Sequence, residues 1–431
     1  MTTALIGFAV LLTLCFAGFR VGFATLIVGA AGFSLERGLG AGLAMTGQQI
    51  IEAGTNYNLS VIPLFILMGV FIYRSDISRD LYDAAQAGFG HFKGGLAMAT
   101  VIACGGFSAV CGSTLATAAT MSKVAMPQMK AFNYSDRLAA GTIAAGGTLG
   151  IMIPPSVPLV IYGIIAEQDI GLLFTAGILP GLMLVSLFLV AVMVSVRLDP
   201  TSAPPSGDLE PARKKEAIRR TLPVLLLFIF VLGGIYGGGF TATEASGIGA
   251  FGAAIIAITR GHLRNIAEWR RCLVEAATTT SKIFIVLFGA VVFTQFINLS
   301  GMPYDLLDFV DDTEMNAVQL VAFIALIALL MGMVFESIGI VVLLVPVFLP
   351  ALAATDVNMI WFGIIIVLVT EIGLISPPIG MNAFVVKSVL PDVKLGDIFR
   401  GIGPYIVALF VGLLLVYFVP SIATLLPNLT R

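Results

Sequence analysis

Charged residues are scarce in this chain. Only 11% of its 431 residues are Asp, Glu, Lys or Arg, and the net charge is −2, whereas about a quarter of the residues in a soluble domain are charged. No basic patch with interleaved aromatic residues occurs, which excludes a nucleic-acid partner. Apolar sequence dominates instead: 58% of residues are hydrophobic and the mean hydropathy is +1.03. Because the apolar runs are unbroken and exceed the roughly ten-residue alternating segments of a membrane β-barrel, the composition predicts an all-α polytopic membrane protein.

Residues that carry catalysis or bind transition metals are also few. His91 and His262 stand alone, and the four cysteines form no C-x-x-C pair, so we expect surface imidazoles and buried thiols. The sequence has no Walker A, H-E-x-x-H or G-x-S-x-G pattern. We therefore expect neither enzymatic activity nor a covalently bound cofactor. The first apolar run, residues 4–32, lacks a basic n-region and a clear cleavage site, which predicts a retained spanning helix.

Two apolar runs contain a Pro-Pro pair, Pro154-Pro155 in the first half and Pro377-Pro378 in the second. Proline has no backbone N–H and clashes with the preceding helical turn, so each pair predicts a break within a membrane helix. Backbone groups freed there cannot face lipid and persist only where they line a protein cavity. Broken helices at corresponding places in two halves indicate the binding site of a secondary transporter.

The remaining apolar runs define the other membrane segments. Runs that approach the roughly 20 residues needed to cross a bilayer are 4–32, 58–73, 138–166, 171–196, 221–240, 244–259, 276–298, 358–386 and 401–427. The stretch 38–56 is more polar and predicts an interfacial helix or a poor span. Residues 94–130 and 316–352 each hold two shorter arms around a polar turn, which predicts two re-entrant hairpins.

The order of hairpin, spacer and broken helix occurs twice. Ser113 precedes Pro154 by 41 residues, and Ser337 precedes Pro377 by 40. We therefore predict a first repeat over 1–197, a cytoplasmic linker with a short basic helix over 198–220, and a second repeat over 221–431. Lysines and arginines flank the first hairpin, whereas acidic residues 305–314 precede the second. By the positive-inside rule the hairpins enter from opposite sides, as in an inverted-topology repeat.

Small hydroxyl residues and glycines gather at the hairpin tips and breaks. Hydroxyl and carbonyl oxygens suit a hard cation such as Na⁺, and a helix that begins at the first tip points its positive end at an anionic group. Ordinary close packing of helices through small residues is the alternative. The predicted Na⁺ ligands are Ser108, Gly112, Ser113, Thr148, Ile153, Pro154, Glu336, Ser337, Gly339, Thr370, Gly373, Ser376 and Pro377. The predicted substrate contacts are Ser113, Thr114, Ser156 and Asn382.

Four ionisable residues lie within apolar sequence, where a charge is expensive and suggests function. Glu336 and Glu371 lie at the second tip and beside the second break, so both are candidates for the site. Glu244 follows Thr241-Ala242-Thr243, a pattern that suits a helix N-cap at least as well as transport chemistry. For Lys282 we favour a structural role, either reaching the cytoplasmic edge or pairing with a carboxylate.

With these hairpin, break and glycine patterns, the chain resembles the large membrane subunit of a tripartite ATP-independent periplasmic (TRAP) transporter. The resemblance covers essentially the whole chain and is most specific over Gly146–Leu182, GGTLGIMIPPSVPLVIYGIIAEQDIGLLFTAGILPGL. Further similar segments are Phe240–Ala245, Val345–Pro350 and Thr370–Val385. Ala242 departs from the family's usual proline. The length matches one large subunit without a fused small one.

The resemblance implies a function beyond what the residues alone indicate. The family couples a Na⁺ gradient to the uptake of carboxylates such as C4-dicarboxylates or sialic acid across the bacterial inner membrane. A periplasmic binding protein delivers the substrate, and a small four-helix membrane subunit supports the scaffold. The family fold is of the elevator type, in which hairpins and broken helices move as one body. One Na⁺ site would involve Ser108, Gly112, Ser113 and the 153–156 break, and the second would involve the 336–339 tip and the 370–377 break.

Two other functions remain open. A stand-alone carrier of the same fold, coupled to Na⁺ or H⁺, would need no binding protein. An intramembrane enzyme or an inert scaffold would need a catalytic dyad in a cavity, which cannot be assembled from this sequence. The substrate itself is not readable from the chain, because in this family the binding protein selects it.

Overall fold

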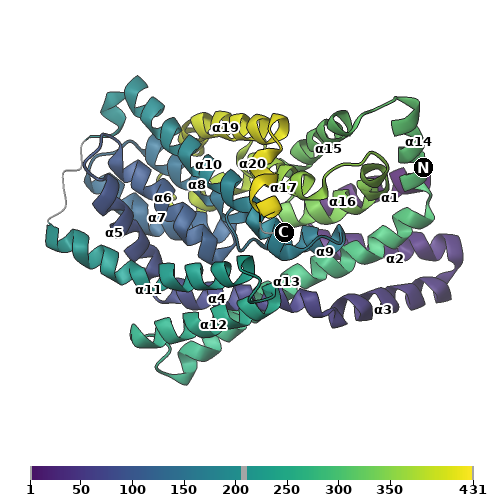
Figure 1. Cartoon of the computed structure of the whole chain (residues 1–431). Helices are drawn as coiled ribbons and strands as arrows, with labels where there is room; N and C mark the ends of the chain where they lie inside the picture. The colour runs from purple at the N-terminus through teal and green to yellow at the C-terminus, as the bar shows by residue number, and fades with distance from the viewer. Residues whose placement is uncertain (1, 205–210, 430–431) are drawn as a thin grey trace.

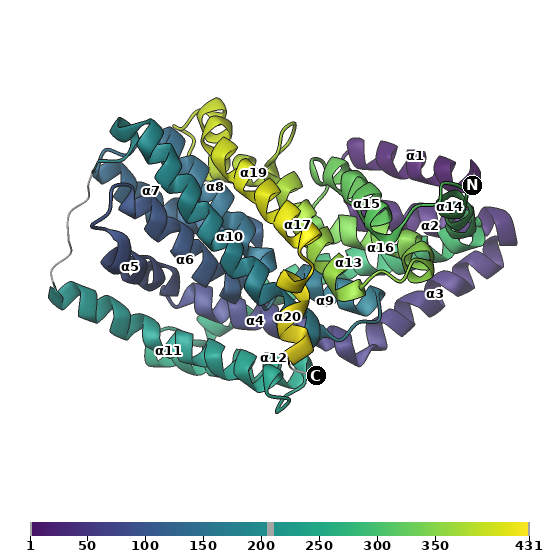
Figure 2. The same cartoon turned by 45° about the horizontal axis from the view of Figure 1, so that its top comes forward.

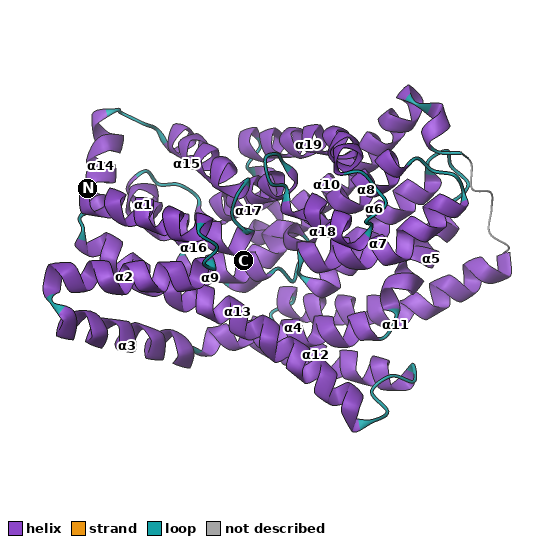
Figure 3. Cartoon of the chain, turned by 180° about the vertical axis from the view of Figure 1, so that it is seen from behind, coloured by secondary structure: helices purple, strands orange, loops and turns teal. Residues whose placement is uncertain are grey.

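The computed structural model describes residues 2–204 and 211–429, and this part of the chain consists of helices and loops without a strand (Figure 3). In the first half the helices are α1 (Thr2–Phe16), α2 (Val21–Arg37), α3 (Leu39–Thr55), the 3₁₀ turn η1 (Tyr57–Ser60), α4 (Val61–Arg74), α5 (Ile77–Phe89), α6 (Gly95–Cys111), α7 (Thr114–Ala131), α8 (Asp136–Met152), α9 (Val157–Ile165), α10 (Ile170–Leu198) and the 3₁₀ turn η2 (Pro200–Ser202).

The second half has the same character. Its helices are α11 (Pro211–Tyr236), α12 (Ala242–Thr259), α13 (Ile266–Leu299), α14 (Met302–Asp312), α15 (Ala317–Gly332), α16 (Ser337–Ala354), α17 (Met359–Ile375), α18 (Met381–Val389), α19 (Leu395–Phe418) and α20 (Ser421–Leu429). Within the described ranges, eight helical segments are long and apolar enough to cross a membrane. The predicted all-α membrane fold is therefore confirmed.

The helices form two packed groups (Figure 1). We call α2, α3, α4, α11, α12 and α13 the lower group, because they line the lower part of that view and pack mainly on one another. The upper group is α6, α7, α8, α10, α17, α18 and α19, which pack around α8. Figure 2 shows α10, α17 and α19 together on the face turned to the viewer. The candidate hairpins and breaks lie within or beside the upper group.

Close contact between α2 and α13 holds the lower group together. A Cβ atom at Gly22 would lie 2.7 Å from the Cα of Val286, and one at Gly29 would lie 2.7 Å from the Cα of Phe293. These two glycines are seven residues apart and therefore share one face of α2. Small residues on a shared face let two membrane helices approach to backbone contact.

Helices are interrupted at both predicted breaks and at both turns predicted as hairpin tips. Residues 153–156 separate α8 from α9, and residues 376–380 separate α17 from α18. Each Pro-Pro peptide bond is cis. Two residues, 112–113, join α6 to α7, and four residues, 333–336, join α15 to α16.

Three predicted segments differ in the structure. The run 4–32 is not one helix, because the chain turns between α1 and α2 at Gly18, whose φ is +95°. The run 401–427 is divided at Val419, which precedes Pro420 and has an extended φ of −125°, since proline disfavours helical geometry in the residue before it. The basic helix expected before residue 221 is continuous with the following span in α11 and carries Pro223 inside it. The rest of the predicted linker includes residues 205–210, which lie outside the described residues.

Candidate functional site: hairpin tips against helix breaks

The first hairpin tip is built by one glycine and one serine. Gly112 ends α6 in the left-handed region with φ +59°, a conformation that glycine adopts without strain. Ser113 then caps α7, with its Oγ accepting from the Ala116 N–H at 3.4 Å. Thr117 Oγ1 donates to the Ser113 carbonyl at 2.8 Å and lies 3.5 Å from Ser108 Oγ. Three hydroxyls and a carbonyl therefore gather within one turn of the tip.

This tip contacts the first break directly. A Cβ atom at Gly112 would lie 3.2 Å from the Pro155 carbonyl oxygen, and one at Gly150 would lie 3.4 Å from both Ser108 Oγ and the Ser113 carbonyl oxygen. On the other side of the break, Ser156 caps α9, accepting from the Leu159 N–H at 3.3 Å and donating to the Ile151 carbonyl at 2.5 Å. The oxygen atoms of the predicted first Na⁺ site are thus brought together.

Three residues predicted for the first site make their described contacts elsewhere than with the hairpin tip. Thr148 is buried and its Oγ1 donates back to the Ala145 carbonyl at 2.8 Å within α8. Ile153 and Pro154 lie against α10, where a Cβ at Gly181 would be 2.9 Å from Ile153 Cγ1 and one at Gly177 would be 3.4 Å from Pro154 Cγ. The α10 helix therefore supports the break from behind.

The second hairpin meets the second break through two glycines. A Cβ atom at Gly373 would lie 2.5 Å from the Gly332 Cα, so α15 and α17 touch backbone to backbone at this point. Thr370 Oγ1 donates to the Val367 carbonyl at 2.7 Å, and Ser376 Oγ donates to the Ile372 carbonyl at 2.6 Å. Both hydroxyls keep lone pairs free to accept or to coordinate a cation. Pro377 follows Ser376 and is exposed.

The second tip is arranged differently from the first. Glu336 is the N-cap residue of α16 and is exposed, whereas the following Ser337 is buried. A Cβ at Gly339 would lie 3.6 Å from Val21 Cγ1 of α2, so this end of α16 lies against the lower group. The contact with the second break is made instead by Gly332, which the sequence analysis did not single out.

Asn382 joins the two halves of the site. It follows the second break on α18, is fully buried, and donates from Nδ2 to the Ala144 carbonyl of α8 at 3.2 Å. A Cβ at Gly147 would lie 3.2 Å from this Nδ2 and 3.0 Å from the Thr114 carbonyl oxygen. The predicted substrate contacts Thr114 and Asn382 therefore meet on the same turn of α8.

Three buried polar groups around the site lack hydrogen-bond partners among the described residues: Asn382 Oδ1, Ser337 Oγ and both carboxylate oxygens of Glu371. Buried polar atoms are nearly always paired in folded proteins. Ser337 lies at the second tip, and Glu371 and Asn382 lie on either side of the second break. Glu371 is fully buried on α17, next to the predicted ligand Thr370.

The other two ionisable candidates, Glu244 and Lys282, lie on α12 and α13. Glu244 forms a capping box with Thr241, accepting from the Thr241 N–H at 2.9 Å while Thr241 Oγ1 accepts from the Glu244 N–H at 3.2 Å. Glu244 therefore caps α12. Lys282 lies on α13, and its pairing with a carboxylate stays a prediction.

The donor atoms at this site are hydroxyl and carbonyl oxygens, which are the ligands a hard monovalent cation takes. No group of three His, Cys, Asp or Glu side chains that could hold a metal ion forms in the described ranges. A cavity of about 150 Å³ lies elsewhere, at the ends of α17 and α20, lined by Gln168, Asn358 and Thr424 among others. It contains none of the predicted site residues.

The chain is similar over most of its length to known membrane transport proteins. Residues 4–422 match the family model described as "Tripartite ATP-independent periplasmic transporter, DctM component". The C4-dicarboxylate TRAP transporter large permease protein of Pseudomonas aeruginosa is 33% identical over 380 residues, 88% of each chain. The sialic acid TRAP transporter large permease protein of Vibrio cholerae is 30% identical over 419 residues, 97% of each chain.

A solved structure shows the same fold. The YdaH transporter of Alcanivorax borkumensis superposes with a TM-score of 0.59 at 14% identity, over 90% of this chain and 88% of that one. Together with the eight apolar segments of membrane-spanning length, these relatives place the chain in the bacterial inner membrane as a multi-pass protein. The chain belongs to the DctM family, the large membrane subunits of tripartite ATP-independent periplasmic transporters.

Proposed function

We propose that this chain is the permease of a Na⁺-coupled symporter that imports a small organic carboxylate. A periplasmic binding protein delivers the substrate, and a small four-helix membrane subunit supports the lower group. The observation that carries the proposal is the contact of each hairpin with its helix break, at Gly112 and Pro155 in the first half and at Gly332 and Gly373 in the second. Na⁺ is a coupling ion in this proposal, not a resident cofactor, and the chain performs no covalent chemistry.

In this proposal the oxygen atoms of the first site hold the cation. In the first half Ser108, Ser113 and Thr117 lie at one tip, and the Pro155 carbonyl faces this tip at Gly112. A cation held there would tie the hairpin to the broken helix and so fix the N-terminal end of α7. The N-terminal end of α7, which begins after Ser113, and the N-terminal end of α9, which begins after Ser156, both offer backbone N–H groups to a carboxylate. Cation binding would therefore complete the substrate site, so that binding of the cation and binding of the carboxylate are coupled.

The two helix groups support an elevator motion. Both breaks begin at the ends of upper-group helices, α8 and α17, α8 packs against α6, α7 and α19, and Asn382 ties α18 to α8. Movement of this group as one body, together with α9, α15 and α16, would keep the hairpin–break contacts intact while changing the side from which they are reached. The lower group, held by close contacts of α2 with α13, would stay fixed.

The test is uptake into proteoliposomes that contain the chain and its small partner subunit. Labelled C4-dicarboxylates and sialic acids are supplied with an inward Na⁺ gradient, with and without the cognate binding protein. We expect uptake that requires both Na⁺ and the binding protein. Uptake without the binding protein would favour the stand-alone carrier, and uptake indifferent to Na⁺ would contradict both cation sites.

A further inference from the structure

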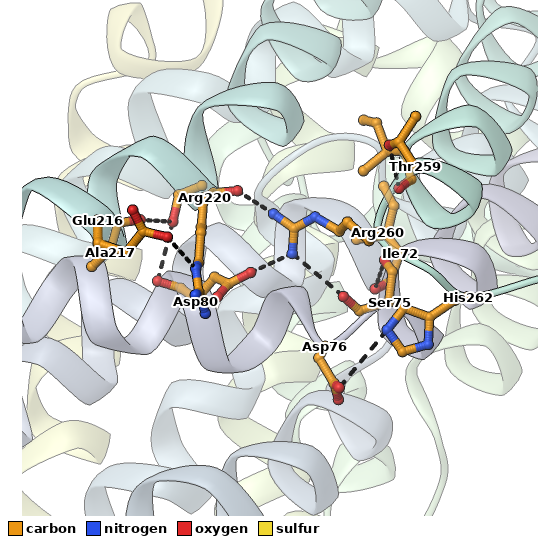
Figure 4. Close-up of polar contacts among 12 residues, drawn as sticks. Ile72, Ser75, Asp76, Asp80, Glu216, Ala217, Arg220, Thr259, Arg260 and His262 are labelled. Atoms are coloured by element: carbon orange, nitrogen blue, oxygen red, sulfur yellow. Dashed lines mark hydrogen bonds and ion pairs between the residues drawn. The ribbon is translucent and has the colours of Figure 1, made fainter. Parts of the chain in front are cut away.

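A polar cluster outside the site joins four segments at the end of α4 (Figure 4). At its centre is Arg260, the residue that follows α12. Its Nη1 donates to Asp80 Oδ2 of α5 and to the Ser75 carbonyl at 3.4 Å, and its Nη2 donates to the Arg220 carbonyl of α11. One guanidinium thus contacts the end of α4, the first turn of α5 and the middle of α11.

The cluster is largely buried and holds Asp80 from two directions. The Arg260 and Asp80 side chains are 18% and 12% exposed. Thr221 of α11, which is buried, donates from Oγ1 to the Asp80 carbonyl at 3.1 Å. The α5 helix is therefore attached to the lower group by its carboxylate and by its backbone at the same residue. Removing one partner of a buried ion pair leaves an uncompensated charge, so the pair acts as a unit.

The α5 helix also contacts the first hairpin. It precedes α6 in the chain and packs along it. Leu81, the neighbour of Asp80, lies on the hairpin side, since a Cβ at Gly106 of α6 would be 3.4 Å from Leu81 Cδ2. Gly106 is two residues from the predicted Na⁺ ligand Ser108. A continuous set of contacts therefore runs from Arg260 through Asp80 and Leu81 to the first cation site.

We propose that Arg260 is a positioning residue that holds α5, and through it the first hairpin, in the conformation described here. The ion pair with Asp80 opens when α5 and the first hairpin move relative to α11 and α12. Neither residue touches substrate or cation. The proposal rests on the proposed transport function only in that it requires the hairpin to move.

The first measurement is hydrogen–deuterium exchange of the full chain in lipid nanodiscs, for Asp80→Asn and Arg260→Gln. We expect exchange over 77–111 to accelerate about tenfold, within the range of known coupling effects, while α19 is unchanged. The double variant should match the single variants instead of adding their effects, because both remove the same interaction. Arg271→Gln, an exposed arginine on α13, is the control and should leave exchange as in the wild type.

A further variant keeps the test informative if the charge variants misfold. Thr221→Val removes the other attachment of Asp80 without burying an unpaired charge, and should accelerate exchange in the same residues by a smaller factor. Acceleration confined to the first turn of α5, or spread equally to α19, would overturn the proposal, since either result describes a merely structural ion pair.

Uptake assays separate this inference from the proposed function. We expect the variants to change the maximal rate at least about twofold, with the Na⁺ concentration for half-maximal uptake unchanged, and Arg260→Lys to restore part of the change through its retained charge. If the wild-type chain shows no Na⁺-dependent uptake, the proposed function fails while the exchange data still report on the ion pair. If uptake is normal and exchange in α6 is unaffected by every variant, the positioning role of Arg260 is wrong.

Discussion

Glu371 is fully buried on α17, and neither of its carboxylate oxygens has a hydrogen-bond partner among the described residues. An unpaired buried polar group costs about 1–3 kcal/mol. We therefore predict that Glu371→Met, which keeps the approximate volume, raises the free energy of unfolding by about 1–3 kcal/mol while abolishing uptake. Thermal unfolding in detergent and uptake in proteoliposomes check the two effects separately. A lower melting temperature for Glu371→Met would show that the carboxyl group has a stabilising partner.

Gly373 is the second residue where stability and function can be tested together. Its Cβ would lie 2.5 Å from the Cα of Gly332, and backbone cannot yield as a flexible side chain can. Gly373→Ala should therefore separate α15 from α17, destabilise the chain by roughly 1–3 kcal/mol and reduce uptake. Gly396→Ala is the matched control, because a Cβ there meets nothing within 4 Å, and it should behave like the wild type. Equal behaviour of the two variants would contradict the close contact.

At the scale of a single helix, the capping box of α12 allows a role in stability to be distinguished from a role in transport. Thr241 and Glu244 satisfy each other's backbone N–H groups, and loss of such a cap costs about 1 kcal/mol. Thr241→Val should lower stability by about that amount with the Na⁺ dependence of uptake unchanged. Glu244→Gln should be close to the wild type in both measurements, since glutamine can serve at the same capping position. A shift in Na⁺ dependence on Glu244→Gln would place this carboxylate in the transport pathway.

Elements with a strong local signal were predictable from the sequence. Pro154-Pro155 and Pro377-Pro378 mark breaks that the structure contains, because proline acts on its own helix turn whatever the tertiary packing. The turn at Gly18 was missed because the apolar run around it is continuous. The helices α5 and α14 were missed because they are amphipathic and less apolar, with Asp80 and Asp305 in their first turns, so no hydrophobic run announces them.

Contacts between distant elements were beyond sequence analysis. The residue types Gly373 and Asn382 were identified, yet their partners Gly332 and the Ala144 carbonyl depend on how whole helices pack. A glycine in an apolar run gives no sign of which backbone it will touch. The carboxylate of Asp80 was likewise unremarkable in sequence, because its partner Arg260 lies 180 residues away.

For the whole molecule, the decisive question is whether the upper group moves against the lower group. At the second tip the predicted site meets the lower group, because α16 lies against α2 and α13. The hairpin–break contacts at Gly112 with Pro155 and at Gly332 with Gly373 do not involve the lower group. A constraint placed between α2 and α16 should therefore block the cycle without touching a predicted cation or substrate contact other than Gly339.

We predict that joining α2 to α16 stops transport reversibly. A Cβ at Gly339 would lie 3.6 Å from Val21 Cγ1, close enough for a disulfide between Val21→Cys and Gly339→Cys, in a chain whose four free cysteines have been replaced by serine. Oxidation should reduce uptake more than about tenfold, and reduction should restore it. The control joins Arg74→Cys to Glu275→Cys with a short thiol cross-linker, because this ion pair, 2.5 Å between Nη2 and Oε2, connects α4 to α13 within the lower group. That constraint should leave uptake unchanged. Full uptake by the oxidised Val21–Gly339 protein would mean that the second tip and α2 keep their contact throughout the cycle, which excludes the elevator motion proposed for this chain.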